Sequence, residues 1–491
     1  MQSHVACGTM AAILCTKEQG TMFFKPYYLG CLAHASYLIG GDNGEAAVID
    51  PRRDVGEYLA DAAAAGLTIT HVIETHLHAD FVSGHLELAR KTGAVISIGH
   101  KAGATFAHHP VHEGDEIALG DVTLRFLETP GHTPEGVTVV ASVRGEETPR
   151  YVFTGDTLFI GDVGRPDLAG SKGFRPEEMA RLLYRSLRDK VLRLPDATEV
   201  WPAHGAGSSC GRALSDARFS TIGIEKATNP ALRSVAAEDE AGFIRYTTEG
   251  LSAAPLYFAH DVARNRAGAL SVDEILGAAQ AFSPAEVEAL SEQGVLVLDT
   301  RSVAEFGKGH VPGAVHVQLE GKFAPWVGAT LAPDSLILVV AAEGHETEAM
   351  MRLARIGYER LVGWLQGGME AWTAAGGECV TVPQIDPESL RAAIAANRAA
   401  PVLDVRARSE WEEGHIEGAT HIPLPELEAR IAEAPEGPLN VMCESGYRSS
   451  IACSLLQRAG HADVTNVVGG WAAWTGSVPS DENESDPVAA G

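Results

Sequence analysis

The fold of this protein can be predicted starting from His71-Val72-Ile73-Glu74-Thr75-His76-Leu77-His78-Ala79-Asp80. The first five residues are typical of a short strand, and the next five carry two histidines and one aspartate at alternating positions. Three metal-binding side chains with this spacing can converge from one loop just past the strand. The stretch therefore predicts a metal-binding loop at a strand end.

Three later stretches place a further histidine or aspartate in a tight turn or after a strand. They are Thr129-Pro130-Gly131-His132-Thr133, Phe153-Thr154-Gly155-Asp156-Thr157 and Val200-Trp201-Pro202-Ala203-His204-Gly205. Strand-like runs such as 46–50 alternate with helical runs such as 176–192, which indicates layers of helix and sheet. We therefore expect an α/β unit over residues 22–262 whose loops share one metal site.

Taken in order, these four stretches resemble the metallo-β-lactamase superfamily. The resemblance covers about residues 22–250 and implies an αββα sandwich with metal ligands on strand-end loops. The binuclear hydrolases of the superfamily, glyoxalase II among them, usually continue the first motif with a histidine where this chain has Phe81. Phenylalanine cannot bind a metal, so a mononuclear centre is expected. Within the superfamily, that resembles the persulfide dioxygenase branch.

The resemblance to this branch implies one Fe(II) per chain, bound by His76, His132 and Asp156, with O₂ as co-substrate. Two imidazoles and one carboxylate on one face leave open positions, an arrangement suited to non-haem Fe(II) and O₂. Zinc with three protein ligands and water is the chemical alternative.

Five further side chains are expected near these ligands. His78, Asp80 and His204 would orient the ligands from outside the coordination sphere. Arg165 lies in a stretch that also resembles the dioxygenases, and it could bind the carboxylate of a thiol carrier or form a structural salt bridge. Cys210 lies in a glycine-rich loop, which is expected to keep its thiol accessible for persulfide sulfur; a buried spectator cysteine is the alternative. That loop resembles the corresponding loop of bacterial dioxygenase–rhodanese fusions.

Beyond the first unit, the sequence contains an internal repeat. Residues 296–301 recur as 401–406, residues 305–314 as 410–419, and residues 365–372 as 467–474. Three matches in the same order, at a spacing near 105 residues, predict two similar domains, which we place at residues 263–380 and 381–478. Residues 1–21 and the acidic tail 479–491 are expected to be flexible extensions.

The second repeat contains Cys443-Glu444-Ser445-Gly446-Tyr447-Arg448, between a strand at 439–442 and a helix. A loop above a helix N-terminus directs backbone N–H groups at its centre, which lowers the pKa of a thiol there. Arg448 adds a positive charge for sulfite or thiosulfate oxygens, and the four residues before it are expected to form the substrate loop. A phosphatase would usually need the longer Cys-x₅-Arg loop.

This Cys-x₄-Arg loop resembles the rhodanese family, over about residues 383–476. The resemblance makes Cys443 the expected nucleophile, whereas Cys453 falls inside the next helix and is expected in the core. The loop of the first repeat, Val340-Ala341-Ala342-Glu343-Gly344-His345-Glu346-Thr347, has neither the cysteine nor the arginine. We therefore expect residues 263–380 to be an inactive rhodanese fold acting as spacer, dimerisation surface or lid, with His345 exposed on its loop.

Composition and charge limit the remaining possibilities. The 491-residue chain is 45% hydrophobic and 21% charged, as in ordinary globular proteins, and it is too long for a single core. A formal charge of −27 argues against nucleic acid and anionic membrane surfaces as partners. No apolar run approaches the ~18 residues that span a bilayer. Seven scattered cysteines suit a reducing cytoplasm, and a homo-oligomer, dimer or tetramer, is expected.

In this order, the three units resemble bacterial persulfide dioxygenase–rhodanese fusions along nearly the whole chain. The implied function is sulfide detoxification: a small thiol persulfide, of glutathione, coenzyme A or a similar thiol, is oxidised to sulfite and thiol. Cys443, loaded as a persulfide, would then transfer sulfur to sulfite and give thiosulfate. The alternatives are a binuclear zinc thioester hydrolase of the glyoxalase II type and a non-enzymatic sulfur carrier or sensor.

Overall fold

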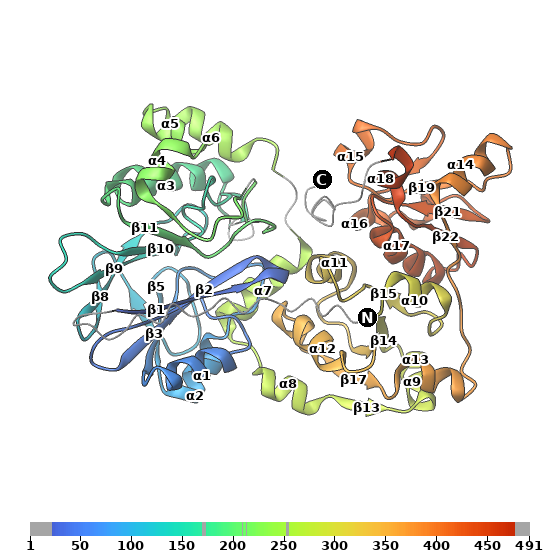
Figure 1. Ribbon diagram of the computed structural model, residues 1–491, viewed down its shortest axis with the longest axis horizontal. Helices are drawn as coiled ribbons and strands as arrows, with labels where there is room; N and C mark the ends of the chain where they lie inside the picture. The colour runs from blue at the N-terminus through green and yellow to red at the C-terminus, as the bar shows by residue number, and fades with distance from the viewer. Residues whose placement is uncertain (1–21, 169–172, 209, 213, 252–254, 477–491) are drawn as a thin grey trace, which may run out of the picture.

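The computed structural model describes residues 22–168, 173–208, 210–212, 214–251 and 255–476, so the expectations for 1–21 and 479–491 fall outside it. Four β-sheets organise the described chain. Figure 1 shows the first two sheets together on one side and the other two in separate domains on the other side. No helix in the described ranges is long and apolar enough to cross a membrane.

The first sheet has the strand order β1-β2-β3-β4-β5-β6. Its strands are β1 (Phe23–Leu29), β2 (His34–Gly40), β3 (Glu45–Ile49), β4 (Thr68–Glu74), β5 (Val95–Gly99) and β6 (His109–Val111). β3 is apolar along residues 46–49 because both of its faces are covered. Ala47 and Ile49 pack against the second sheet, whereas Ala46 and Val48 pack towards α1 (Gly56–Ala64) and α2 (His85–Thr92).

The second sheet has the strand order β12-β11-β10-β9-β8-β7. Its strands are β7 (Glu116–Leu119), β8 (Val122–Glu128), β9 (Val137–Val143), β10 (Tyr151–Gly155), β11 (Glu199–Pro202) and β12 (Ser220–Thr221). Its outer face is covered by α3 (Pro176–Asp189), α4 (Ile222–Thr228), α5 (Leu232–Ala236) and α6 (Glu240–Thr248). Leu183 and Leu187 lie one turn apart on the buried face of α3. The expected αββα sandwich is confirmed.

The two remaining sheets have equivalent strand orders, β13-β17-β16-β14-β15 and β18-β22-β21-β19-β20, and all their strand pairs are parallel. The middle domain contains β13 (Gln280–Phe282), α9 (Pro284–Glu292), β14 (Leu296–Asp299), α10 (Val303–Lys308), β15 (Val315–His316), α11 (Phe323–Thr330), β16 (Ile337–Val340), α12 (Glu346–Arg355), β17 (Leu361–Leu365) and α13 (Gly368–Ala374). The internal repeat therefore corresponds to two domains of one topology.

The last domain contains β18 (Gln384–Ile385), α14 (Pro387–Ala395), β19 (Val402–Asp404), α15 (Arg408–Glu413), β20 (Thr420–His421), α16 (Leu424–Leu427), β21 (Leu439–Met442), α17 (Tyr447–Arg458), β22 (Val464–Val467) and α18 (Gly470–Thr475). The sandwich is joined to the middle domain by α7 (Leu256–Ala267) and α8 (Val272–Ala278). The boundary that we placed between residues 262 and 263 falls inside α7, which contacts both units.

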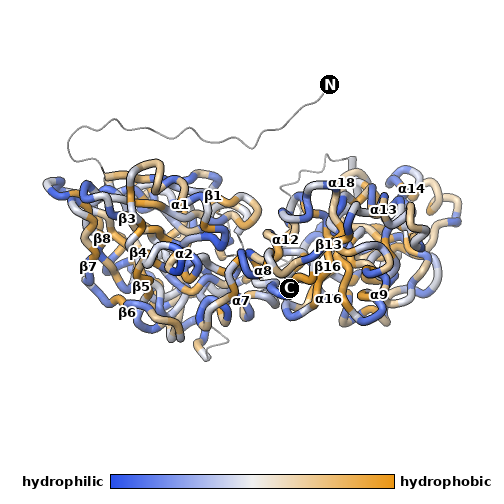
Figure 2. The backbone as a smooth tube through the Cα atoms, turned by 90° about the horizontal axis from the view of Figure 1, so that it is seen from below, coloured by the Kyte–Doolittle hydropathy of each residue, from blue (hydrophilic) through white to orange (hydrophobic). Residues whose placement is uncertain are grey.

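One of the buried hydrophobic clusters extends across all three domains. Figure 2 shows hydrophobic segments running through the strands of both halves of the molecule. The largest buried cluster joins Phe81 of the sandwich, Tyr257 and Phe258 of α7, and apolar side chains of both later domains. Phe81, which directly follows Asp80, is fully buried in this cluster. The position therefore serves interdomain packing.

Polar contacts also join the sandwich to the middle domain. Arg53 pairs with Glu359, and Arg355 forms two hydrogen bonds of 2.8 Å with Asp54. The backbone N–H of Val82, in the metal-binding loop, donates to the carbonyl of Arg355 at 2.7 Å. The middle domain is thus attached to the back of that loop.

His316 lies at the contact between the middle and last domains. Its Nδ1 accepts from the Ser450 hydroxyl at 2.9 Å, and its Nε2–H donates to the carbonyl of Arg301 at 2.9 Å. Its backbone N–H donates to Ser454 Oγ at 3.0 Å. A neutral ring satisfies both contacts, and burial lowers the pKa of His316 to about 4.

This buried histidine makes domain stability depend on pH. The unfolded chain binds the proton below a pKa of about 6.5, but the folded chain binds it only below about 4, so stability falls as pH drops through that window. Between pH 7 and pH 5 we expect a loss of about 2 kcal/mol from this group. Denaturant unfolding of the parent and of His316→Gln should show it: the parent loses more stability than the variant. Parallel pH profiles would contradict the assignment.

Candidate functional site

The candidate metal site lies where loops from both sheets of the sandwich meet. His76 follows β4 of the first sheet, whereas His132, Asp156 and His204 come from the β8–β9 loop and the ends of β10 and β11 in the second. Glycine is required next to this site. Gly155 has φ 52°, and a Cβ atom there would lie 2.5 Å from Thr75 Oγ1. The two sheets can therefore approach closely enough for the ligands to converge.

The structure brings His76, His132 and Asp156 together. Asp156 Oδ2 lies 3.6 Å from His76 Nε2 and 3.4 Å from His132 Nε2. Two ligands ~2.1 Å from one ion lie ~3.0 to ~3.4 Å apart, so the observed distances are within a few tenths of an ångström of those expected for a shared metal. All three side chains are buried, and Asp156 Oδ2 receives no hydrogen bond within the described chain. The donor set fits a metal ion.

Each ligand histidine is oriented through its other ring nitrogen. His76 Nδ1 lies 2.9 Å from Thr75 Oγ1, whose hydroxyl donates to Asp50 Oδ2 at 2.8 Å. His132 Nδ1 donates to the carbonyl of Arg165 at 2.9 Å. Because Nδ1 carries the proton in both rings, Nε2 is free to bind the metal.

The charges around the ligands also favour metal binding. Burial alone would raise the pKa of Asp156, but His204, His76 and His132 hold it well below its ordinary value. Burial, followed by the neighbouring His78, lowers the pKa of His76. The carboxylate is therefore ionised and His76 neutral, the forms in which these side chains bind metals.

His204 lies between Asp156 and Asp80 and contacts both carboxylates. His204 Nδ1 donates to Asp156 Oδ1 at 2.8 Å, and its Nε2 lies 2.9 Å from Asp80 Oδ2. Burial opposes protonation of His204, but Asp156 and Asp80 raise its pKa well above the ordinary value. The sulfur of Cys210 lies within 4.8 Å of the ligand atoms of Asp156 and His204. These atoms form a second group of possible ligands beside the first.

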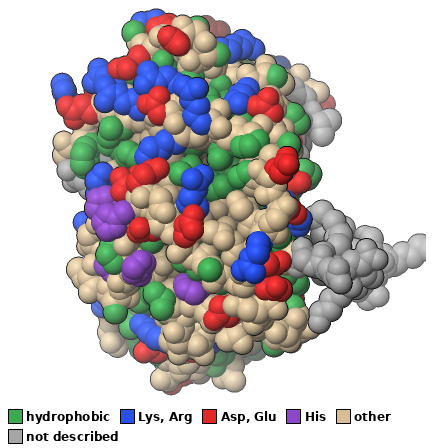
Figure 3. Space-filling view, turned by 90° about the vertical axis from the view of Figure 1, so that its left-hand side faces the viewer, with side chains coloured by type: hydrophobic (Ala, Val, Ile, Leu, Met, Phe, Trp, Pro, Cys, Tyr) green, Lys and Arg blue, Asp and Glu red, His purple; other side chains and the backbone are tan. Residues whose placement is uncertain are grey.

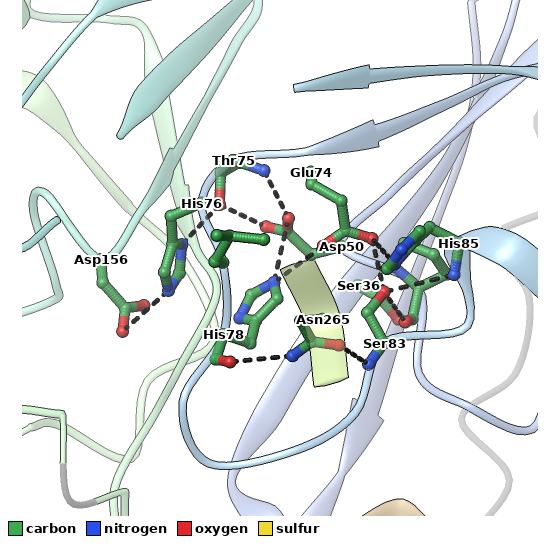
Figure 4. Close-up of polar contacts among 12 residues, drawn as sticks. Ser36, Asp50, Glu74, Thr75, His76, His78, Ser83, His85, Asp156 and Asn265 are labelled. Carbon is green, nitrogen blue, oxygen red and sulfur yellow. Dashed lines mark hydrogen bonds and ion pairs between the residues drawn. The ribbon is translucent and has the colours of Figure 1, made fainter. Parts of the chain in front are cut away.

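The His78 ring lies beside the His76 ring, with centroids 4.2 Å apart, and its Nε2 faces Asp50 (Figure 4). Its Nε2 lies 3.2 Å from Asp50 Oδ1 and 3.3 Å from Glu74 Oε2. Burial disfavours its charge, but these two acids raise the pKa of His78 to about 10. Since Asp50 also accepts from Thr75, the polar contacts of His78 reach the His76 ring through Asp50 and Thr75.

The structure corrects the expectation for Cys210. Its thiol is 1% exposed, because the loop is held against the sandwich by a 3.0 Å hydrogen bond from Arg165 N to Cys210 O. Burial, followed by Asp80 and Asp156, raises the pKa of this thiol. For Arg165, the structure shows the alternative: a buried guanidinium that donates to both carboxylate oxygens of Asp167, at 2.8 and 2.7 Å.

The back of the metal-binding loop is held by Asn265 of α7 (Figure 4). Its Nδ2 donates to the carbonyls of His78 and Phe81 at 2.8 and 2.7 Å. Its Oδ1 accepts from Ser83 N at 2.8 Å. One amide thus satisfies three backbone groups of the loop.

Asn265→Leu should therefore destabilise the sandwich and weaken metal retention. The change leaves three buried backbone groups unpaired, each costing about 1–3 kcal/mol. We expect a loss of about 3 kcal/mol or more in unfolding free energy, with faster metal loss to a chelator. Asn43→Leu, at an exposed turn, is the matched control. Equal stability of the two variants would show that α7 does not hold the loop.

Cys443 lies in a cradle between β21 and α17. Its Sγ accepts from Gly446 N at 3.0 Å and lies 3.3 Å from the Ser449 hydroxyl. Gly446 has φ 108°, the left-handed region in which glycine turns its N–H towards the sulfur. The helix begins at Tyr447, so Tyr447 and Arg448 belong to its first turn and not to the loop. Cys443 is completely buried, and Cys453 lies in the core as expected.

Charged side chains surround this cradle. The Arg448 guanidinium donates to both oxygens of Glu410 at 2.7 Å. Burial raises the pKa of Glu444, whose carboxylate lies 3.9 Å from Arg406. The carbonyl of Ser445 accepts from Gly469 N at 2.8 Å, which fixes the loop. In the middle domain, His345 is exposed as expected, 3.2 Å from Glu348.

Sequence reasoning missed four residues of these sites: Asp50, Glu74, Asn265 and Glu410. Asp50 directly follows β3 and Glu74 ends β4, and a polar residue at the end of an apolar strand was the available signal. Glu410 corresponds to Glu305 in the first repeat, and this recurrence indicated a structural role. Asn265 carries no local signal, because its partners lie more than 180 positions earlier.

Other features of the molecule lie away from these sites. A cavity of about 280 Å³ between α11 and α16–α17 is lined by neither the candidate ligands nor Cys443. Histidine side chains gather on the outer face of the sandwich (Figure 3). Among the exposed ones, His100 and His112 stack with ring centroids 4.5 Å apart, and His100 also lies 3.2 Å from Glu128. These groups are separate from the buried metal ligands.

Comparison with known families gives matches over most of the chain. Residues 29–204 match the metallo-beta-lactamase superfamily. Residues 283–375 and 386–477 match the rhodanese-like domain. A metallo-beta-lactamase from Staphylococcus aureus of known crystal structure is 34% identical with a TM-score of 0.62, over 70% of this chain and 98% of that one.

Curated relatives of the first domain include hydrolases and persulfide dioxygenases. A probable metallo-hydrolase of Burkholderia pseudomallei is 33% identical over 49% of this chain and 90% of its own length. A hydroxyacylglutathione hydrolase of a Methylobacterium species is 32% identical over 39% of this chain and 79% of its own length. The persulfide dioxygenase ETHE1 of Homo sapiens is 30% identical over 40% of this chain and 70% of its own length.

Proposed function

Because the chain belongs to the metallo-β-lactamase superfamily and continues into two rhodanese-like domains, we propose that it oxidises a small thiol persulfide and transfers sulfur to the product. The proposed first reaction is RSSH + O₂ + H₂O → RSH + SO₃²⁻ + 2 H⁺. The proposed second reaction moves a sulfane sulfur from Cys443 to sulfite and gives thiosulfate. The thiol carrier would be glutathione, coenzyme A or a similar thiol.

One observation supports the first reaction above the others. The buried His76/His132/Asp156 set offers two imidazole nitrogens and one carboxylate oxygen, and Phe81 removes a nitrogen from the adjoining group. Such a set leaves several positions on one ion open. Fe(II) bound there would supply a place for persulfide and O₂ to meet. The comparison with persulfide dioxygenases points in the same direction.

The protein's own residues set the conditions of this reaction. Thr75 and the Arg165 carbonyl hold the two imidazole rings, and His204 fixes the carboxylate of Asp156. The burial of all three ligands limits access of water, which protects a reactive persulfide from side reactions.

The experiment that tests the proposal uses the full-length chain. Metal content is measured first, and O₂ consumption is then followed with glutathione persulfide and coenzyme A persulfide. About one iron per chain and persulfide-dependent O₂ uptake, with one sulfite formed per O₂ when Cys443 is blocked, would support it. Two zinc ions per chain without O₂ uptake would contradict it.

Thioester hydrolysis is the second candidate function. The observation in its favour is the group His78, Asp80 and His204, with Cys210 near Asp156, which could hold another ion beside the first. The hydroxyacylglutathione hydrolases among the relatives add to it. Hydrolysis of a hydroxyacylglutathione by the zinc-loaded chain would favour this function, and the same measurement on the iron-loaded chain provides the comparison.

A further inference from the structure

The middle domain has no cysteine in the loop equivalent to that of Cys443, but it packs against the helix that follows the Cys443 loop. The Tyr447 hydroxyl donates to the carbonyl of Gln318 at 2.7 Å, and a Cβ at Gly321 would lie 3.8 Å from the Tyr447 ring. Cys443 and Trp326 belong to the same buried cluster. Gln318, Gly321 and Trp326 of the middle domain therefore form a wall against the first turn of α17, the helix that follows the Cys443 loop.

Trp326 is the unusual member of this wall. It lies on α11, is 1% exposed, and its ring centre is 5.9 Å from Arg448 Cζ. Its Nε1–H meets no hydrogen-bond acceptor within the described chain. By contrast, the buried Trp372 of the same domain donates its Nε1–H to the carbonyl of Glu378 at 2.8 Å.

A buried donor without an acceptor needs a physical explanation. It costs about 1–3 kcal/mol, so most such groups in folded proteins are paired. A ligand that brings an acceptor would remove this cost. An indole N–H can only donate, and its neighbour is a cation, so the ligand chemistry that fits is an oxyanion. Arg448 alone is a limited anion site, because Glu410 already accepts two of its hydrogen bonds.

We propose that Trp326 completes the sulfur-transfer site from the neighbouring domain by donating its indole N–H to a sulfite or thiosulfate oxygen held beside Arg448. This inference rests on the sulfurtransferase function proposed above. It gives the middle domain a role in binding the sulfur acceptor, although that domain has no thiol in its loop.

The transfer step itself is balanced without any other reactant. The sulfur lone pair of sulfite attacks the terminal sulfur of the Cys443 persulfide and forms the new S–S bond of thiosulfate. The bond between that sulfur and Sγ breaks, and its electron pair returns to Sγ as a thiolate, towards which Gly446 N–H points. Trp326 transfers no proton in this step; it holds an oxygen of the acceptor.

The test compares Trp326→Phe with Trp372→Phe in the full-length chain. Each change removes one buried indole N–H, but only the first lies beside Arg448. Thiosulfate binding is measured by calorimetry in a Cys443→Ser background, which prevents turnover. We expect the dissociation constant to rise about tenfold for Trp326→Phe, which is about 1.4 kcal/mol, and to stay unchanged for Trp372→Phe.

Steady-state kinetics of chains that retain Cys443 provide a second readout. In thiosulfate-to-cyanide transfer, Trp326→Phe should raise the KM for thiosulfate about tenfold and leave the KM for cyanide, which has no oxygen atoms, unchanged. Trp326→His, which keeps a ring N–H, should recover part of the affinity for thiosulfate. It replaces Trp326→Phe in the test if the phenylalanine variant does not fold. Equal binding by parent and Trp326→Phe, or equal weakening in both phenylalanine variants, would overturn the proposal. Absence of transfer by the parent would instead reject the sulfurtransferase function, while the calorimetry still reports on the anion site.

Discussion

Asp156→Ala is expected to empty the metal site and abolish persulfide-dependent O₂ uptake. Asp156 is the single carboxylate of the candidate set, and its Oδ2 faces both histidine nitrogens. Its loss leaves two neutral imidazoles to hold a divalent cation. Losing a partner outside the coordination sphere typically costs 10–100-fold in metal affinity, so loss of this ligand should cost more than about 100-fold.

Metal content after dialysis and O₂ uptake measure this expectation. Sulfur transfer from thiosulfate to cyanide should continue at the parent rate, because Cys443 lies in another domain. Asp196→Ala removes a carboxylate that is 72% exposed and should change neither activity. Retention of about one iron per chain by Asp156→Ala would place the metal elsewhere.

Cys443→Ser is expected to remove sulfur transfer while O₂ uptake continues. A serine hydroxyl fits the same cradle, but it is not ionised near neutral pH and cannot carry a sulfane sulfur. The rate of thiosulfate-to-cyanide transfer should fall by about 10³-fold or more. With persulfide as the only substrate, the product should change from thiosulfate to sulfite.

Product analysis by ion chromatography distinguishes these outcomes. Cys379→Ser removes an exposed thiol of the middle domain and is the matched control. If Cys443→Ser left thiosulfate output unchanged with persulfide alone, the two reactions would not be coupled through this residue. Cys210→Ser then becomes informative, because that sulfur lies near Asp156 and His204.

Local motifs allowed the fold and the two candidate sites to be predicted. His76, His132, Asp156 and His204 each stand beside a recognisable strand end or turn, so the convergence of their loops followed from the sandwich. The repeat predicted two domains of one topology. The Cys443 loop was recognised because nucleophile, turn glycine and arginine lie within six consecutive positions.

The sequence did not predict contacts between distant segments. Asn265 and Arg355 both reach the loop that contains Phe81 and Val82, and nothing in their local sequence points to it. The exposure of Cys210 was predicted wrongly for the same reason. A glycine-rich composition describes the freedom of a loop in isolation, whereas burial depends on the segments that pack over it.

The hydrogen bond between Val82 and Arg355 has a consequence for biosynthesis. Arg355 is translated 273 residues after Val82 (355 − 82), which at about 5–20 residues per second takes roughly 14–55 seconds. During that interval the nascent sandwich carries His76 on a loop whose contacts with Asn265 and Arg355 have not yet been made. We therefore expect stable metal acquisition to follow release of the middle domain from the ribosome. Ribosome-bound chains stalled before residue 265 should exchange their metal faster than the finished protein.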